Sequence, residues 1–139
     1  MGQLARFGVS LNSGLLKRFD ALIREKGYTN RSEALRDIIR DQLVADEWRA
    51  GPEEAVAVVS LVYDHHQLDL PNRLTNMQHD HHGMVLSSLH VHLQRHSCLE
   101  VLVLRGPGKK VKSLANRLAG ARGVKHGKVT LTTSGEELG

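Results

Sequence analysis

Two histidines and the only cysteine of the chain lie close together in one short stretch. His90 and His92 are separated by one residue, and Cys98 follows six residues later. Apolar residues alternate with them on both sides, which is typical of two β-strands. Residues i and i+2 share a strand face, and if the chain reverses near residues 94–97, facing Cβ atoms lie about 4.5–5.5 Å apart. The spacing therefore predicts that two imidazoles and a thiolate converge as three of the four ligands of a transition metal.

The fourth ligand is not fixed by this spacing. Eight of the nine histidines fall within residues 65–96, and such clustering indicates shared chemistry. The candidates are His65, His66, His79, His81, His82, His96 and Glu100. A thiolate with imidazoles suits Ni(II) or Cu(II) in a planar arrangement and Zn(II) in a tetrahedral one, so the residues alone leave the metal open.

Composition narrows the class of protein. The chain has 139 residues, a formal charge of +4 and 40% hydrophobic residues, enough for one domain or two small ones. A single cysteine excludes an internal disulfide framework and suits a reducing cytoplasm, and no apolar run reaches the length of a membrane span. A metal hydrolase would need an open coordination position and a general base. No motif for one is present, so we expect no enzyme and assign no catalytic residues.

The first 50 residues predict a strand followed by two helices. Phe7, Val9 and Leu11 alternate with Arg6, Gly8 and Ser10. This strand has no neighbour along the chain to pair with, so we expect its partner in a second copy. Asn12 or Ser13 is suited to cap a first helix, and Asn30, with Glu33 three residues later, is suited to cap a second that ends near residue 48.

A composition change at residues 51–54, which contain Gly, Pro and two Glu, predicts a linker between domains 1–50 and 55–132. Beyond it we expect strands at 55–63, 85–93, 98–104 and 124–131, with helices from Leu70 and around 111–118. The order βαββαβ is that of a ferredoxin-like fold, with both helices on one face of a four-stranded sheet. We expect the metal ligands on the other, uncovered face, where subunits would meet, and a polar tail at 133–139.

The run Gly-Tyr-x-Asn-Arg-Ser-Glu-Ala-Leu-Arg-Asp at residues 27–37 resembles the start of helix two in the ribbon-helix-helix DNA-binding family. The resemblance implies that two chains pair their strands into a ribbon in the DNA major groove. It assigns base reading to Arg6, Gly8 and Ser10, and phosphate binding to Asn30, Arg31 and Ser32. Gly8 has no side chain with which to read a base.

Nearly the whole chain resembles the nickel-responsive transcriptional regulator family. The shared runs are Gln-His-x-His-His from Gln78, Leu-His-Val-His-Leu from Leu89, and Cys-Leu-Glu from Cys98. The resemblance implies square-planar Ni(II), one per subunit, bound by His90, His92 and Cys98 of one chain and His79 of another. Tyr63, His65 and Glu100 are the expected neighbours that orient the imidazoles.

The same resemblance implies a cytoplasmic α+β protein with an ACT-like regulatory domain, assembled as a homotetramer that is a dimer of dimers. It would bind a palindromic double-stranded operator and repress nickel uptake genes when Ni(II) is bound. A second cation, such as potassium, would lie near Glu33, Asp37, Ala121, Arg122 and Val124. The alternatives are a response to Co, Cu or Zn, or a metal-buffering protein. Buffering would leave the first 50 residues unexplained.

Overall fold

The computed structural model describes residues 2–67, 69–81, 83–136 and 138, so His82 lies outside the described residues. The elements form an α+β protein with one antiparallel sheet of four strands. The chain divides into two compact units. One contains Met1–Val44 with Gly135–Gly139, and the other is Ala45–Ser134.

Two capped helices make up most of the first unit. Helix α1 (Ser13–Glu25) begins at Asn12, whose side-chain oxygen accepts a 2.8 Å hydrogen bond from the backbone N–H of Gly14. Helix α2 (Arg31–Ala50) follows Asn30, whose Oδ1 accepts a 2.9 Å bond from the N–H of Glu33. Both bonds satisfy backbone donors that a helix start leaves without partners, so the sequence identified both helix starts correctly.

The strand expected near residues 7–11 is not formed within one chain, because residues 2–12 carry no regular secondary structure. A strand is held by hydrogen bonds to a neighbouring strand, and among the described residues the sheet contains only β1 to β4. Phe7, Val9 and Leu11 all stay exposed. The sequence expects this strand only where a second copy pairs with it, so the single chain leaves that prediction untested.

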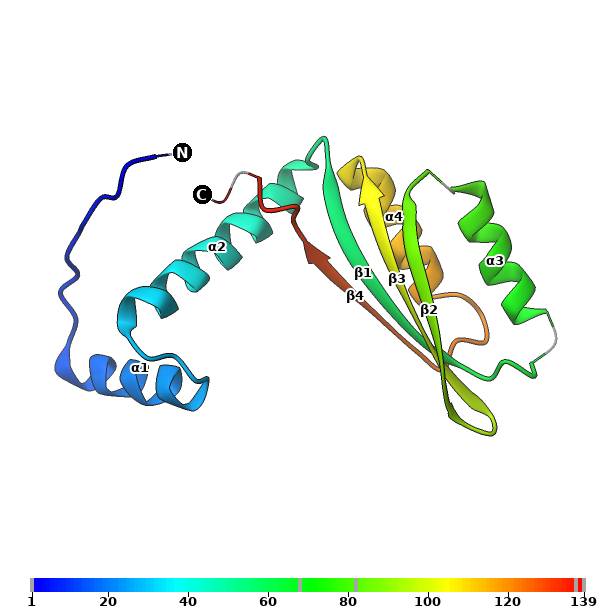
Figure 1. The fold of residues 1–139 in the computed structure, drawn as a ribbon, viewed down its shortest axis with the longest axis horizontal. Helices are drawn as coiled ribbons and strands as arrows, with labels where there is room; N and C mark the ends of the chain where they lie inside the picture. The colour runs from blue at the N-terminus through cyan, green and yellow to red at the C-terminus, as the bar shows by residue number, and fades with distance from the viewer. Residues whose placement is uncertain (1, 68, 82, 137, 139) are drawn as a thin grey trace. The chain divides into compact units, whose positions relative to one another are not determined.

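The second unit has the βαββαβ order that the sequence predicts. Its elements are β1 (Ala55–Tyr63), α3 (Leu70–Asp80), β2 (Val85–Gln94), β3 (Ser97–Gly106), α4 (Gly108–Ala119) and β4 (His126–Thr132). The strands lie in the order β2-β3-β1-β4, and all three neighbouring pairs are antiparallel (Figure 1). This is the ferredoxin-like arrangement, so the expected fold class is confirmed.

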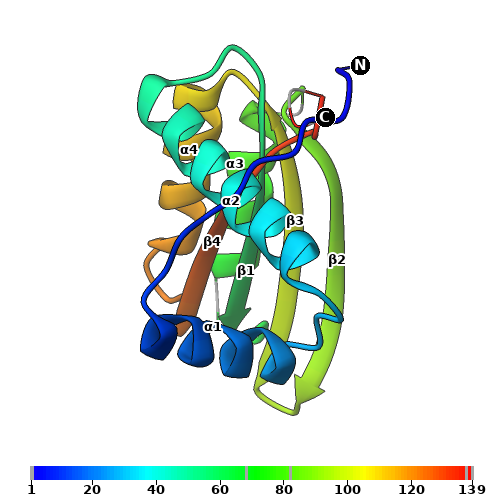
Figure 2. The same cartoon turned by 90° about the vertical axis from the view of Figure 1, so that its left-hand side faces the viewer.

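The core of the second unit lies between α4 and one face of the sheet. Figure 2 shows α4 on one side of the strands. Alternate residues of β1 and β3 are buried, among them Leu61 and Leu102, and the apolar stripe of α4 supplies Leu114 and Leu118. At the end of α2, Trp48 is buried and its indole N–H donates a 2.9 Å bond to the carbonyl of Thr132. The last turn of α2 is thereby fixed to β4.

The expected ligands lie on the face that the helices cover, which corrects the prediction of an uncovered face. Cys98 and Glu100 belong to the buried set of β3, and they pair in register with Tyr63 and Leu61 of β1. On β2, the apolar residues Leu89, Val91 and Leu93 are exposed. Alternation correctly grouped the residues that share a face. It gave the wrong face because it assumed that the apolar side of β2 packs on the chain's own helices.

Candidate metal centre

The thiol of Cys98 is the buried end of the expected metal centre. Cys98 is 2% exposed on β3 and pairs in register with His92 on one side and Tyr63 on the other. His90 pairs with Glu100, so the two imidazoles and the thiol lie on one face of neighbouring strands. Both histidines are exposed, as expected for edge strand β2. A soft ligand inside and two imidazoles at the rim form a donor set that suits a borderline transition metal.

Glu100 is the centre of a polar network behind His90. It is 1% exposed, accepts a 2.9 Å bond from the hydroxyl of Tyr63, and lies 3.2 Å from Nε2 of His90. The side-chain amide of Gln78 donates a 3.1 Å bond to its other carboxylate oxygen, Oε2. The network joins β1, β2, β3 and α3. A buried carboxylate is expected to have such partners because burying it without them would be costly.

Gln78 is the member of this network that sequence reasoning missed. It lies within the run that drew attention to the histidines, but glutamine is rarely a metal ligand, and nothing in the pattern linked it to Glu100. Its position immediately before His79, in the last turn of α3, connects the carboxylate to an exposed imidazole.

His65 lies beside the expected ligands. Its ring centre is 4.9 Å from that of His92, with the rings nearly perpendicular. Its Nδ1 is buried and has no hydrogen-bond partner. Burial lowers the pKa of His65, with the neighbouring histidines acting in the same direction, so the ring is neutral at pH 7. A buried nitrogen without a partner next to His92 fits a metal, or a group that a metal orders, at this place.

Burial also raises the pKa of the Cys98 thiol, although a hydrogen bond with Tyr63 acts in the opposite direction. Burial next to Glu100 raises the pKa of Tyr63. Both groups are therefore protonated at neutral pH. A divalent cation would reverse this for the thiol, because a coordinating thiol is deprotonated. The residues present fit a bound transition metal.

The four expected ligands do not all converge within the described part of one chain. Among the described residues, the group whose ligand atoms all lie within 4.8 Å of one another is Asp64, His65 and His66. His79 is exposed at the end of α3. His81 instead bonds through Nδ1 to the carbonyl of Met77, at 3.0 Å.

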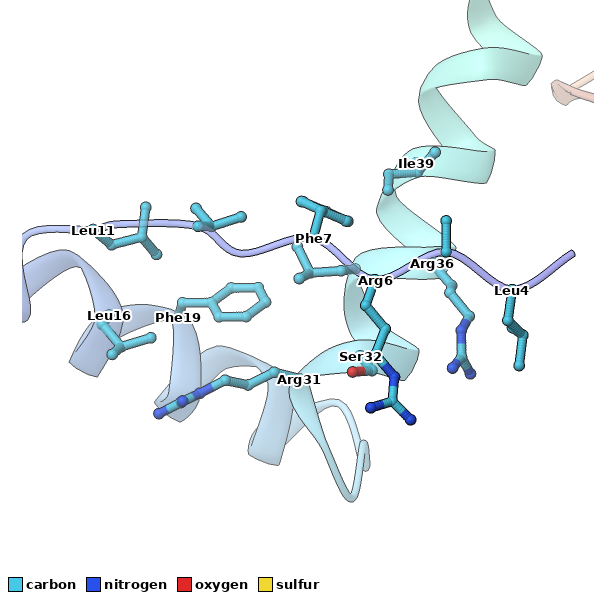
Figure 3. A pocket seen from close by; sticks show the side chains of 13 residues that line it. Leu4, Arg6, Phe7, Leu11, Leu16, Phe19, Arg31, Ser32, Arg36 and Ile39 are labelled. Carbon is cyan, nitrogen blue, oxygen red and sulfur yellow. The ribbon is translucent and has the colours of Figure 1, made fainter.

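The expected DNA-contacting residues belong to the first unit. Its N-terminal segment runs along a pocket of about 670 Å³, which Phe7, Val9 and Leu11 line, whereas Gly8 and Ser10 do not (Figure 3). Arg6 and Ser32 are also at this pocket. The Arg31 guanidinium is paired with Asp20 through two 2.9 Å hydrogen bonds, and the side chain of Asn30 serves as a helix cap. Gly8 and Ser10 thus lie off the pocket, whereas Arg6 lines it together with the apolar residues. Two of the expected phosphate-binding side chains already have partners.

The residues expected near a second cation have partners within their own units. In the first unit, Asp37 accepts a 2.5 Å bond from the hydroxyl of Tyr28, and Glu33 accepts a 3.5 Å bond from the hydroxyl of Thr29. In the second, the carbonyl of Arg122 accepts a 2.7 Å bond from the guanidinium of Arg73. The N–H of Val124 donates to the carbonyl of Ala121 at 3.0 Å.

Comparison with known proteins covers both units. Residues 56–132 match the family model described as the NikR C-terminal nickel-binding domain, and residues 5–45 match the ribbon-helix-helix proteins of the copG family. Among solved structures, an uncharacterized protein of Thermotoga maritima covers 58% of this chain with a TM-score of 0.51 and 15% identity, a likeness of fold alone. Within the described residues, no helix combines the length and apolar character that a membrane span requires.

Several regulators are similar to this chain along their whole length. A protein of Geobacter sulfurreducens is 59% identical over 138 residues, and one of Nitratidesulfovibrio vulgaris (strain Miyazaki F) is 56% identical. A third, from Geotalea uraniireducens, is also 56% identical. Each alignment covers 99% of both chains, and each of these proteins is named as a nickel-responsive regulator. The chain therefore belongs to the family of nickel-responsive transcriptional regulators, whose members join a ribbon-helix-helix domain to a nickel-binding domain.

Proposed function

We propose that this protein is a cytoplasmic, nickel-dependent repressor of nickel uptake genes. One Ni(II) per subunit would be held by His90, His92 and Cys98, with His79 supplied by another chain. The observation that carries the proposal is the buried thiol of Cys98 in register with His92, with His90 on the same face. When bound, the metal supplies charge and a fixed set of bonds that the apo protein lacks.

Glu100 prepares His90 for this role. At 3.2 Å, the carboxylate can accept a hydrogen bond from Nε2–H of His90. An imidazole that carries its proton on Nε2 has a lone pair on Nδ1, which is the form a metal ligand needs. Because Tyr63 and Gln78 also donate to Glu100, the carboxylate is fixed in place and holds the ring in that tautomer.

Gln78 connects the same carboxylate to α3. His79 is the next residue, so a change that tightens the hydrogen bonds around Glu100 also restrains the end of α3. We infer that metal binding orders α3 and that its exposed imidazole completes the site of a neighbouring chain. Binding of nickel and assembly of the chains would then occur together.

The first unit supports a dimeric DNA-binding end. Phe7, Val9, Leu11 and Ile39 are exposed, yet all of them line the same pocket. A second chain would bury these groups and pair the two N-terminal segments as a ribbon. Arg6, Gly8 and Ser10 would then face the bases. Since the Arg31 side chain is paired with Asp20, we assign phosphate binding at the start of α2 to backbone N–H groups and Ser32.

The uncovered face of the sheet supports assembly of the regulatory units. Leu86, Leu89, Val91 and Leu93 are exposed on β2, and Val101 and Val103 of β3 are only half-buried. Leu89, Val91 and Leu93 alternate along β2 beside Val101 and Val103 of β3, and together they make one apolar surface, which a second regulatory unit would cover. We propose a homotetramer with a DNA-binding dimer at each end and a palindromic operator. A second cation, such as potassium, would bind near Glu33, Asp37, Ala121, Arg122 and Val124 in the DNA-bound state.

The test compares DNA affinity with and without Ni(II). A preferred sequence is selected from random duplexes with the full-length protein and Ni(II), and its affinity is measured for the wild type, Cys98→Ala and the control His126→Ala. A ligand that drives a two-state change must bind the two states differently, so we expect strong nickel dependence in the wild type and control and none in Cys98→Ala. Equal affinity with and without metal in the wild type would contradict the proposal.

The identity of the metal is tested separately. Apo protein is titrated with Ni(II), Cu(II), Co(II) and Zn(II) while absorption spectra are recorded. We expect Ni(II) to give a thiolate-to-metal band with the features of a planar site, absent in Cys98→Ala. Stronger DNA binding with Zn(II) or Co(II) than with Ni(II) would assign the response to that metal instead.

A further inference from the structure

The turn between β2 and β3 connects two of the proposed nickel ligands. It consists of Arg95 and His96, and His92 and Cys98 pair in register on either side of it. The register shifts between His92 and Gln94, so the pairing is irregular next to the thiol. A bulge of this kind interrupts the hydrogen bonds between the strands and lets the strand bend. Strand pairing alone therefore does not fix the thiol against the imidazole.

The ammonium group of Lys125 holds this turn. Its Nζ donates a 2.9 Å hydrogen bond to the carbonyl of His96 and a 3.1 Å bond to the hydroxyl of Ser97. These are the two residues immediately before Cys98. Figure 1 shows the start of β4 and the β2–β3 turn at the same end of the sheet. Because β1 lies between β3 and β4 and ends there, the lysine side chain spans past the end of β1.

The backbone of Lys125 is itself anchored in the sheet. Its N–H donates a 2.8 Å bond to the carbonyl of Val62 in β1. Val62 pairs with Leu99 of β3 on one side and with His126 of β4 on the other. Hydrogen bonds from a charged donor are stronger than those between neutral groups. The turn is thus tied through one side chain to a fixed point on the central strands.

We propose that Lys125 is a positioning residue for the nickel site, an inference that rests on the function proposed above. By holding His96 and Ser97, it places the Cys98 thiol against His92 and limits the directions that the thiol can take. A planar Ni(II) site needs its donors in fixed directions, whereas Zn(II) has no geometric preference from its own electrons. Lys125 therefore favours Ni(II) over Zn(II).

The charge of Lys125 predicts effects of the opposite sign. A positive charge near the site repels a bound cation, so its removal by itself raises metal affinity. A positive charge also favours a thiolate, so its removal by itself slows the reaction of the Cys98 thiol. Positioning predicts that the loss of Lys125 lowers nickel affinity and makes the thiol react faster, because the turn opens more often.

The first measurement uses the full-length protein without metal. Cys98 is the only cysteine and is 2% exposed, so its modification by an aromatic disulfide reports how often the turn opens. We expect Lys125→Met to react about tenfold faster than the wild type, the scale for two lost hydrogen bonds. Lys125→Arg keeps donors for both acceptors and should react like the wild type. The matched control is Lys128→Met, which removes an exposed lysine of β4. Equal rates in Lys125→Met and Lys128→Met would overturn the proposal.

The second measurement compares Ni(II) and Zn(II) affinities of the same variants by competition with a chelator. We expect Lys125→Met to lose about tenfold in nickel affinity, as for other groups that orient a ligand, with a smaller loss for zinc. The thiolate-to-nickel absorption band should shift in Lys125→Met and be restored in Lys125→Arg. An equal loss for both metals would mean that Lys125 only supports the fold, and a gain for nickel would mean that its charge dominates. Either result refutes the positioning role. Nickel affinity of Cys98→Ala equal to that of the wild type would instead reject the nickel site itself.

Discussion

The two units of this protein differ in how much of their apolar surface one chain buries. Among the described residues, the buried apolar side chains of Met1–Val44 are Ile23 and Ala34 alone, whereas the unit Ala45–Ser134 buries Leu61, Leu102, Leu118 and many others. The regulatory unit therefore has a complete core within one chain. The DNA-binding unit leaves most of its apolar residues exposed, and by our proposal a second chain completes its core. The regulatory unit needs other chains only for its open sheet face and, by our proposal, for one ligand.

The largest expected difference between the units is the loss of DNA affinity caused by Phe7→Lys. Phe7 is 72% exposed in one chain but lines the apolar pocket of the first unit, and a charge there prevents a partner from burying it. Specific binding is about 10³-fold or more tighter than non-specific binding, so loss of the paired ribbon should cost at least about that factor. Gel-shift titration with the selected operator measures it.

The matched control for this change is Gln3→Lys, which adds the same charge to the same segment outside the alternating apolar residues. Nickel stoichiometry should be unchanged in both variants, because the regulatory unit folds on its own core. If Phe7→Lys bound the operator as tightly as Gln3→Lys, the first unit would not depend on a partner for its core.

The next largest effect should come from Leu118→Ala. Leu118 is 0% exposed in α4, so its truncation leaves a cavity and should destabilise the regulatory unit by about 3 kcal/mol. Leu22→Ala removes the same atoms from α1, where the side chain is 47% exposed in one chain. Urea unfolding at several protein concentrations separates the two. We expect the loss of stability in Leu22→Ala to depend on protein concentration and the loss in Leu118→Ala not to. If only the loss in Leu118→Ala depended on concentration, the comparison between the units would be wrong.

Helix starts and strand order were predictable because their causes are local. Asn12 and Asn30 cap helices through bonds to residues two and three positions away, and the βαββαβ order follows from periodicity and glycine positions. The strand near Phe7 stays a prediction, because the hydrogen-bond partners that it needs belong to no described strand of one chain. Local pattern cannot tell whether a partner is present.

The face of the metal centre was wrongly predicted for a related reason. The histidines of β2 alternate with Leu89, Val91 and Leu93, and the usual rule turns apolar residues toward the chain's own helices. Here Cys98 and Glu100 are on the helix side, and the leucines are exposed. Gln78 was missed because its role depends on Glu100, which is distant in sequence. What the sequence could indicate was which side chains share a face.

A smaller effect, confined to the regulatory unit, is expected from Glu100→Gln. The change keeps the shape but gives a neutral amide in place of the acceptor that Tyr63, Gln78 and His90 share. Losing a partner that orients a ligand typically costs about 10–100-fold in metal affinity. Competition with a nickel chelator measures the loss. Gln42→Glu, in α2, is the control for a Glu and Gln exchange, and a Glu100→Gln affinity equal to that of the wild type would remove Glu100 from the site.

Counted per pH unit, the smallest expected effect is the dependence of nickel affinity on pH. The thiol of Cys98 must lose its proton to bind a metal, and burial raises its pKa above the ordinary value. Below that pKa the thiol releases its proton on binding, so the thiol alone should raise the affinity by about tenfold per pH unit between pH 6 and 8. The sign is opposite for the stability of the nickel-free protein. The folded state favours the neutral thiol, so this contribution is lost as the pH rises beyond the ordinary thiol value.

The two units should differ in this dependence. The DNA-binding unit, Met1–Val44 with Gly135–Gly139, contains no histidine, so it has no imidazole that could titrate between pH 6 and 8. Chelator competition at several pH values, with apo unfolding followed in parallel, measures both. Since His65 is already neutral at pH 7, a slope that survives in Cys98→Ser would have to come from the other histidines. A flat affinity in the wild type would show that the thiolate is not a ligand.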